Sequence, residues 1–245
     1  MHEIFLPFRQ KQTLLQVGLC ALVFIGMAVP FKVMVLVEGF TEVRPVNAVP
    51  VVAGLLLGPA GAWGCAIGNL VADLFGTFSS ASVLGFLGNF IAAYLPYKLW
   101  HTWKKGEKPN VKSGQNLGIY LAIAAISSLT VAVFIACGLD VWQNFWLPEI
   151  FYIILYNNFG FPLILGLPVL IVLTCDDHRI EPYLPKDKKH SALKKRMTFF
   201  SLTALLIAQV AILVMIGFGY IMSGFLPLGA AGGVFLLSLF VFLLL

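Results

Sequence analysis

Two polar side chains lie four residues apart in an apolar stretch, Asn69 and Asp73 near the end of residues 60–75. Residues i and i+4 of a helix are neighbours on one face. A carboxylate in a membrane-spanning segment is costly and usually faces a protein interior or a water-filled cavity. The pair could therefore accept and donate hydrogen bonds to a ligand. The simpler explanations are a helix end at Asp73 and a hydrogen bond between helices at Asn69.

Other polar side chains begin the neighbouring apolar runs or lie a few turns inside them. If the runs cross a membrane in alternating directions, these groups all fall in its outer half, which predicts one pocket open to the outside. Glu42 and Arg44 could instead be solvated loop charges, and Tyr152 and Tyr156 could be aromatic residues of the membrane surface. The candidate substrate-binding residues are Glu42, Arg44, Asn47, Asn69, Asp73, Asn89, Glu149, Tyr152, Tyr156 and Asn157.

The composition indicates an all-α integral membrane protein. Of its 245 residues, 60% are hydrophobic and 11% are charged, whereas a soluble domain has about 25% charged residues. The mean hydropathy is +0.93. The apolar runs do not alternate as the strands of a membrane barrel do, and helices satisfy their backbone polar groups internally. The expected spans are residues 13–37, 47–58, 60–75, 83–101, 117–138, 149–174, 198–222 and 226–245.

The second and third spans are shorter than the ~20 residues of a comfortable crossing, and the sequence Gly58-Pro59-Ala60-Gly61 separates them. We interpret them as two short helices joined by a tight inner turn. With this hairpin, nearly all lysines and arginines fall on one side, and only Arg44 and Lys32 lie towards the other. Basic loops stay cytoplasmic, so both termini are expected inside the cell. Lys32, in the outer third of the first span, either snorkels to the surface or turns inward.

No residues form a recognisable catalytic or metal-binding set. The four histidines fall on the cytoplasmic side, and the four cysteines have neither metal nor redox spacing, which favours small buried hydrophobic side chains. No phosphate-binding loop is present. We therefore expect no enzyme activity, no cofactor and no nucleic-acid partner. Energy for any active transport must come from a partner or an ion gradient.

The run from Thr41 to Gly76, TEVRPVNAVPVVAGLLLGPAGAWGCAIGNLVADLFG, resembles spans 2 and 3 of the substrate-binding S-components of energy-coupling factor (ECF) transporters. These share a short span-2 helix, a Gly-Pro turn and a Gly-rich span 3 ending in Asn and Asp. The resemblance implies capture of a vitamin-like micronutrient in an outward-facing pocket capped by the loop after span 1. It also implies a membrane coupling subunit and two cytoplasmic ATPase subunits as partners, in the plasma membrane of a prokaryote. Gly18 and Ala21 would face the coupling subunit.

The resemblance implies a six-helix bundle in residues 1–175. The residues themselves predict a basic cytoplasmic linker, 176–197, and an additional two-helix hairpin, 198–245. That hairpin departs from the six spans usual in S-components, and span 1 lacks a clean Ala-x-x-x-Ala pair. Three alternatives remain open on the residues alone. They are a self-contained secondary transporter, an intramembrane enzyme acting on a lipid through Asp73 or Glu149, and a structural membrane subunit without a ligand.

Overall fold

The computed structural model describes residues 3–37, 41–76, 78–145, 147–175, 181–185, 192–218 and 231–245. Its elements are almost all helical, as the sequence predicts. The short ones are η1 (Glu3–Arg9), η2 (Val29–Phe31), β1 (Val35–Val37), β2 (Thr41–Glu42), η3 (Pro45–Asn47) and η4 (Pro162–Gly166). The α-helices are α1 (Lys11–Ala28), α2 (Ala48–Leu57), α3 (Pro59–Asp73), α4 (Ala81–Trp103), α5 (Gly114–Gln143), α6 (Pro148–Phe161), α7 (Leu167–Thr174), α8 (Ala192–Gly217) and α9 (Gly233–Leu244).

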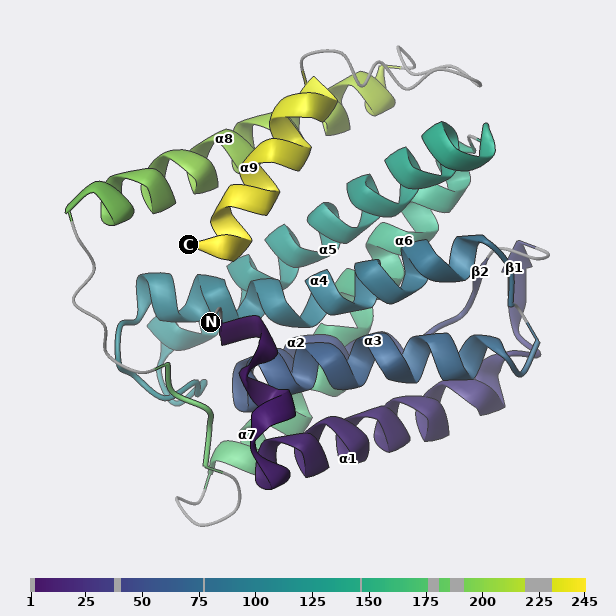
Figure 1. Cartoon of the computed structure of the whole chain (residues 1–245). Coiled ribbons are helices and arrows are strands. Elements are labelled where there is room, and N and C mark those ends of the chain that lie inside the picture. Colours follow the sequence, from purple (N-terminus) through teal and green to yellow (C-terminus); the bar gives the residue numbers. More distant parts are fainter. Residues whose placement is uncertain are drawn as a thin grey trace.

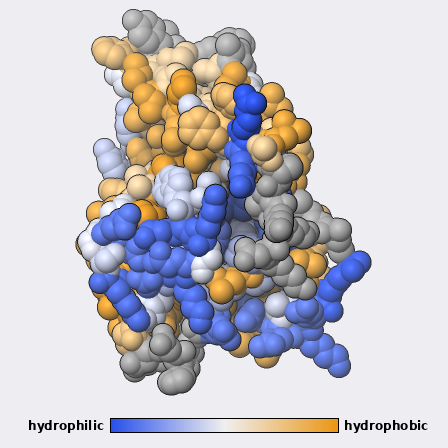
Figure 2. All heavy atoms as spheres, turned by 90° about the vertical axis from the view of Figure 1, so that its left-hand side faces the viewer, coloured by the Kyte–Doolittle hydropathy of each residue, from blue (hydrophilic) through white to orange (hydrophobic). Residues whose placement is uncertain are grey.

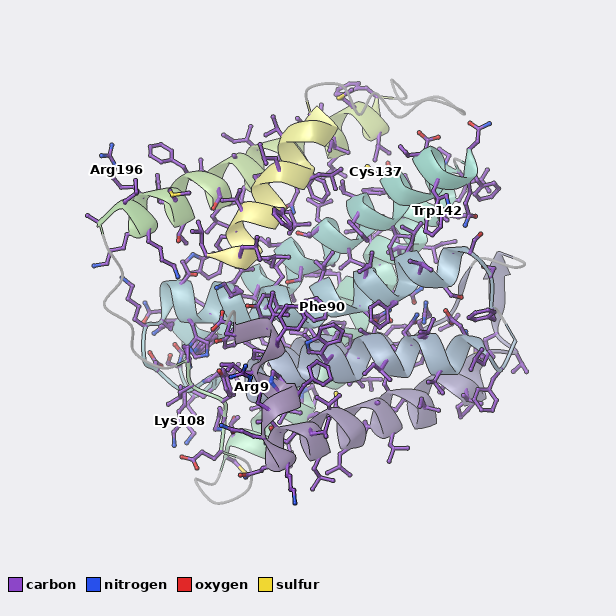
Figure 3. The ribbon with its side chains drawn as sticks, in the orientation of Figure 1. Arg9, Phe90, Lys108, Cys137, Trp142 and Arg196 are labelled. Carbon is purple, nitrogen blue, oxygen red and sulfur yellow. The ribbon has the colours of Figure 1, made fainter. Side chains whose placement is uncertain are left out.

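The helices lie side by side with two distinct ends (Figure 1). Helix α1 packs on α3, α3 on α4, α4 on α5, and α5 on both α6 and α8. At the right of Figure 1, the hairpin end contains β1, β2 and the end of α3; at the left, the basic end contains both chain termini. Figure 2 looks at the basic end, where hydrophilic side chains gather. Arg9, Lys108 and Arg196 lie there, and Trp142 lies towards the hairpin end (Figure 3).

Four helical stretches among the described residues are long and apolar enough to cross a membrane: Lys11–Phe31, Gly114–Gln143, Pro148–Thr174 and Ala192–Gly217. The predicted all-α membrane fold is confirmed. The first predicted span reaches less far than expected, because α1 ends at Ala28 and the chain then forms η2 and β1. Pro30 lacks a backbone N–H and so does not continue the helix ladder. The expected turn near Gly224 and Pro227 lies outside the described residues.

The predicted break between the second and third spans is confirmed at Gly58. This residue has φ +55° and ψ −129°, a conformation that glycine tolerates because it lacks a Cβ atom. Pro59 then opens α3 at a position where its missing N–H costs nothing. A Cβ atom at Gly58 would lie 2.7 Å from the ring of Tyr183. Tyr183 is held there because its N–H donates to the carbonyl oxygen of Leu56 at 2.8 Å.

Glycines bring α3 into backbone contact with its neighbour α1. A Cβ atom at Gly64 would lie 2.5 Å from the Cβ of Cys20, and one at Gly68 would lie 2.7 Å from the Cβ of Phe24. The four-residue spacing of these two glycines is the pattern that lets membrane helices pack closely. This contact sets the distance between the ends of α1 and α3, where Lys32 and Asp73 lie.

The stretch Pro148–Thr174 is one helix that contains a π-helical turn. Helix α6 continues through the π-helical segment η4 into α7 without leaving the helical path. Pro162 begins η4, and its carbonyl oxygen accepts a hydrogen bond of 2.7 Å from the buried hydroxyl of Tyr120 on α5. Such widened turns arise where the regular helix ladder is interrupted. The Tyr120 hydroxyl thus supplies a partner from the neighbouring helix.

The C-terminal pair, α8 and α9, packs on the side of the bundle formed by α5. Helix α8 begins at Ala192, inside the range predicted as a linker. Gln209 on α8 is 1% exposed, and its side-chain amide donates a hydrogen bond to the hydroxyl of Thr130 on α5. Polar side chains that bond across membrane helices hold them together. The division into domains at 175 and 197 stays a prediction.

The N-terminal segment η1 is held against α3 and α4 by one carboxylate and one indole. Glu3 accepts hydrogen bonds from Tyr94 at 2.9 Å, from Tyr97 at 3.1 Å and from the Lys98 ammonium at 3.1 Å. The indole of Trp63 donates to the carbonyl oxygen of Ile4 at 2.8 Å. Burial acts to raise the pKa of Glu3, but the charge of Lys98 and the three hydrogen bonds outweigh it, so the pKa lies below its ordinary value of 4.5.

We expect Gly58→Ala to lower the free energy of unfolding by about 2–4 kcal/mol, because it adds backbone strain of ~1–3 kcal/mol to a clash with Tyr183. Thermal unfolding of the purified protein in detergent measures the change. Gly106→Ala is the matched control, since Gly106 also has positive φ, +70°, but no atom lies within 4 Å of an added Cβ. Equal losses for the two variants would contradict the packing of Tyr183 on the turn.

We expect η1 to detach as the pH falls from the unfolded-state pKa of ~4.3 through the lower pKa of Glu3 in the folded protein, because the stability from a lowered carboxyl pKa is lost on protonation. Hydrogen exchange of residues 4–9 as a function of pH measures the detachment. Glu3→Gln should show low protection factors, that is, exchange close to the intrinsic rate at each pH, already at pH 7 and no further loss of protection on acidification. A variant that keeps the wild-type pH profile would show that Glu3 does not hold the segment.

Candidate functional site

An ion pair connects the segment after α1 to the end of α3. The Lys32 Nζ atom lies 2.9 Å from Oδ1 of Asp73, and the two side chains are 7% and 9% exposed. The other carboxylate oxygen, Oδ2, accepts a hydrogen bond of 3.2 Å from the amide of Asn69. Asn69 is itself fully buried. The predicted shared face of Asn69 and Asp73 is therefore a direct contact between the two side chains.

Arg44 extends this network to a third helix. Its Nη2 atom donates to Oδ1 of Asn69 at 2.6 Å, and its backbone N–H donates to Oδ1 of Asn157 on α6 at 3.3 Å. Asn157 is 7% exposed. Arg44 directly follows the β1–β2 hairpin, in which Val35 pairs with Glu42. The hairpin is thus tied to α3 at one end by Lys32 and to α3 and α6 at the other end by Arg44.

Helix α4 meets the network at a glycine. A Cβ atom at Gly85 would lie 2.7 Å from the amide nitrogen of Asn69 and 3.7 Å from Oδ2 of Asp73. Only a residue without a side chain lets α4 come this close. One turn further along, Asn89 is buried and donates to the carbonyl oxygen of Gly85 at 2.9 Å. Asn89 therefore lies beside the network, with its amide hydrogen bonded to its own helix.

The remaining predicted residues fall into two groups. Asn47 is buried, 5% exposed, at the start of α2, three residues after Arg44. Of Glu42 only the backbone in β2 is described. Glu149 is exposed in the first turn of α6, where a carboxylate favours the positive end of the helix dipole. Tyr152 stacks on Tyr156 with ring centres 6.3 Å apart, and Tyr156 is 68% exposed.

The structure therefore brings together Arg44, Asn69, Asp73 and Asn157 from the predicted set and places Asn47 and Asn89 beside them. It leaves Glu149 and Tyr156 on the surface. Sequence reasoning did not assign Lys32 to the site. The available signal was the cost of burying its charge: a lysine in the outer third of a span needs a partner, and Asp73 is one of the acids expected in the outer half.

The chemistry that the network offers is recognition by hydrogen bonds. Carboxylate oxygens accept only, a guanidinium donates only, and amides do both. A ligand with adjacent donors and acceptors could bind across Asp73, Asn69 and Arg44. Within the described residues, no group of three or more His, Cys, Asp or Glu side chains could hold a metal ion.

The two residues predicted to dock a partner lie on different faces of α1. Gly18 is exposed, with no atom within 4 Å of an added Cβ. Ala21 is buried, and its carbonyl oxygen lies 3.0 Å from the position of a Cβ on Gly68. Ala21 therefore supports the close contact of α1 with α3. The exposed face of α1 instead combines Gly18 with Leu15, Leu19 and Leu22.

A comparison with protein families gives one match, to the QueT transporter family over residues 14–175. The chain belongs to this family. Its members are S-components of energy-coupling factor transporters, as the sequence resemblance indicates. An S-component captures a small-molecule substrate and pairs with an energy-coupling module. No curated protein and no solved structure matches the chain. The matched residues hold the whole Lys32–Asp73–Asn69–Arg44–Asn157 network, whereas α8 and α9 lie beyond them.

We expect Gly85→Ala to disturb the network, because the new methyl group must displace the buried amide of Asn69. Overpacking of this kind costs ~1–3 kcal/mol, and exchange of the Arg44 backbone amide should become faster. Thermal unfolding and hydrogen exchange measure the two effects. Gly88→Ala is the control on the same helix, since its new methyl group meets the flexible end of Ile135 at 2.9 Å. Faster exchange at Arg44 in the control would contradict a specific role for Gly85.

Proposed function

We propose that this protein is the substrate-capture subunit of an ATP-driven importer and that it binds a queuosine precursor from outside the cell. The family supports the substrate class, because QueT transporters are S-components for queuosine precursors. The observation that carries the proposal is the buried network of Arg44, Asn69, Asp73 and Asn157 at the hairpin end. Small-molecule sites combine apolar walls with a few placed polar groups of this kind.

The chemistry of the network suits the base of a queuosine precursor, which carries a guanine-like 7-deazapurine ring. Guanine presents an acceptor, O6, beside donors on N1 and N2. On our proposal the Asp73 carboxylate accepts from the two donors, and the Arg44 guanidinium donates to the acceptor. The amide of Asn69 lies between these charged groups and is bonded to both of them. An adenine-like base lacks this order of donors and acceptors and could not make both contacts.

The orientation follows from the distribution of charge. Arg9, Lys108 and Arg196 belong to the basic end (Figure 3), where hydrophilic side chains gather (Figure 2), and basic loops remain in the cytoplasm. On this basis the protein is a multi-pass protein of the plasma membrane with both termini inside, and the network faces outward. The partners are then a membrane coupling subunit and two cytoplasmic ATPase subunits. Transport energy comes from these partners, and the chain itself catalyses no reaction.

Purification from the native host in mild detergent tests the assembly. Mass spectrometry of the proteins and small molecules that co-purify should find ATPase subunits and a 7-deazapurine base. Recovery of the chain without ATPase subunits and without a ligand would overturn the proposal that it belongs to an ATP-driven importer. It would favour a self-contained transporter or a structural subunit.

A pair of neighbouring asparagines on α6 tests the site. Asn157→Ala removes the acceptor for the Arg44 backbone and should weaken binding of 7-deazaguanine roughly tenfold, as expected for the loss of ~1.4 kcal/mol. Asn158→Ala is the matched control, because the Asn158 amide donates to the carbonyl oxygen of Ile154 on its own helix at 2.9 Å. Isothermal titration calorimetry measures both. Equal affinities in the two variants would place the site elsewhere.

A further inference from the structure

The Lys32 ammonium occupies one of the positions on Asp73 where a ligand donor would bind. It lies 2.9 Å from Oδ1, while Oδ2 accepts from Asn69, so a described protein donor contacts each carboxylate oxygen. Both side chains are nearly buried, at 7% and 9% exposure. An ammonium group is strongly hydrated, and its burial is tolerated when a carboxylate pairs with it.

From this geometry we infer that Lys32 is an internal competitor of the substrate: its ammonium holds the donor position on Asp73, and the bound substrate displaces it. The inference rests on the proposed function, since it concerns the same site. The substrate must then offer Asp73 donors that replace an ammonium. Two N–H groups facing the two carboxylate oxygens do so, because a carboxylate accepts bidentate pairs. A ligand that offers only acceptors cannot.

Displacement of Lys32 also changes how the hairpin is held. Lys32 lies three residues before β1, and the backbone N–H of Val43, just after β2, donates to the carbonyl oxygen of Met34 at 3.0 Å. The other end stays attached through Arg44 to Asn69 and Asn157. Release of Lys32 therefore loosens the β1 side of the hairpin while the β2 side remains bound.

Substitution of Lys32 separates competition from a direct role in binding. Lys32→Met keeps the length of the side chain and removes its charge. If Asp73 is free of the Lys32 ammonium in about a tenth of the wild-type molecules, removal of that ammonium lowers the dissociation constant for 7-deazaguanine about tenfold. Lys32→Gln, which is neutral but can still donate, should give a smaller improvement and serves if Lys32→Met does not fold. Weaker or unchanged binding in the folded variants would overturn the inference.

A second readout does not need the ligand. Hydrogen exchange of residues 33–37 and 41–45 in the ligand-free protein should become faster in Lys32→Met. Lys98→Met is the matched control, because Lys98 makes a comparable ion pair with Glu3, at 3.1 Å, at the basic end. Unchanged exchange in Lys32→Met, or an equal increase in both variants, would overturn the role of Lys32 in holding the hairpin.

The two readouts distinguish failure of this inference from failure of the proposed function. If no protein variant binds 7-deazaguanine, the proposed substrate is wrong, and hydrogen exchange alone decides whether Lys32 holds the hairpin. A further comparison uses a 7-deazapurine without the 2-amino group. The wild-type protein should lose more affinity for this analogue than Lys32→Met, because a single donor displaces the ammonium less effectively. Equal losses would contradict competition at Asp73.

Discussion

The close approach of α3 to its neighbours is the contact on which the rest of the outer region depends. Gly64 and Gly68 let α1 come to backbone distance, and Gly85 lets α4 reach the amide of Asn69. No long side chain separates the three helices at these points. As a result, Lys32 from the segment after α1 and Asp73 from the end of α3 meet within hydrogen-bond distance, with the backbone of α4 packed beside them. Larger residues at these positions would keep Asp73 away from Lys32.

Burial then makes the charges of this region depend on each other. An ammonium or a carboxylate removed from water is stable only when it is paired and hydrogen bonded. The network satisfies this requirement with a chain of hydrogen bonds. The chain runs from Lys32 to Asp73, then to Asn69 and finally to Arg44. An isolated two-stranded hairpin is at best marginally stable in water. Its two ends are held here by Lys32 and Arg44, the same groups that belong to the proposed binding site, so on our proposal the hairpin and the site are linked.

The sequence predicts the helical membrane fold because composition and apolar run length determine it almost alone. It also predicts the break at Gly58 and the shared face of Asn69 and Asp73, since both follow from local rules of helix geometry. Other features depend on contacts between distant segments. Lys32 turns inward because Asp73 is there to pair with its ammonium group. Ala21 is buried because α1 packs against Gly68 of α3 at that point. The exposure of Glu149 and Tyr156 likewise depends on the rotation of α6, which residue spacing does not determine.

The C-terminal pair gives the protein an asymmetric outline in the plane of the bilayer. Helices α8 and α9 extend the bundle on the α5 side, while α1 forms the opposite edge (Figure 1). Outward-facing Phe199, Ile207, Val210 and Leu237 present a hydrocarbon surface to lipid. The bond from buried Gln209 to Thr130 couples the pair to α5. If the bundle tilts in a membrane, the pair is carried with it and adds its apolar surface on the α5 side.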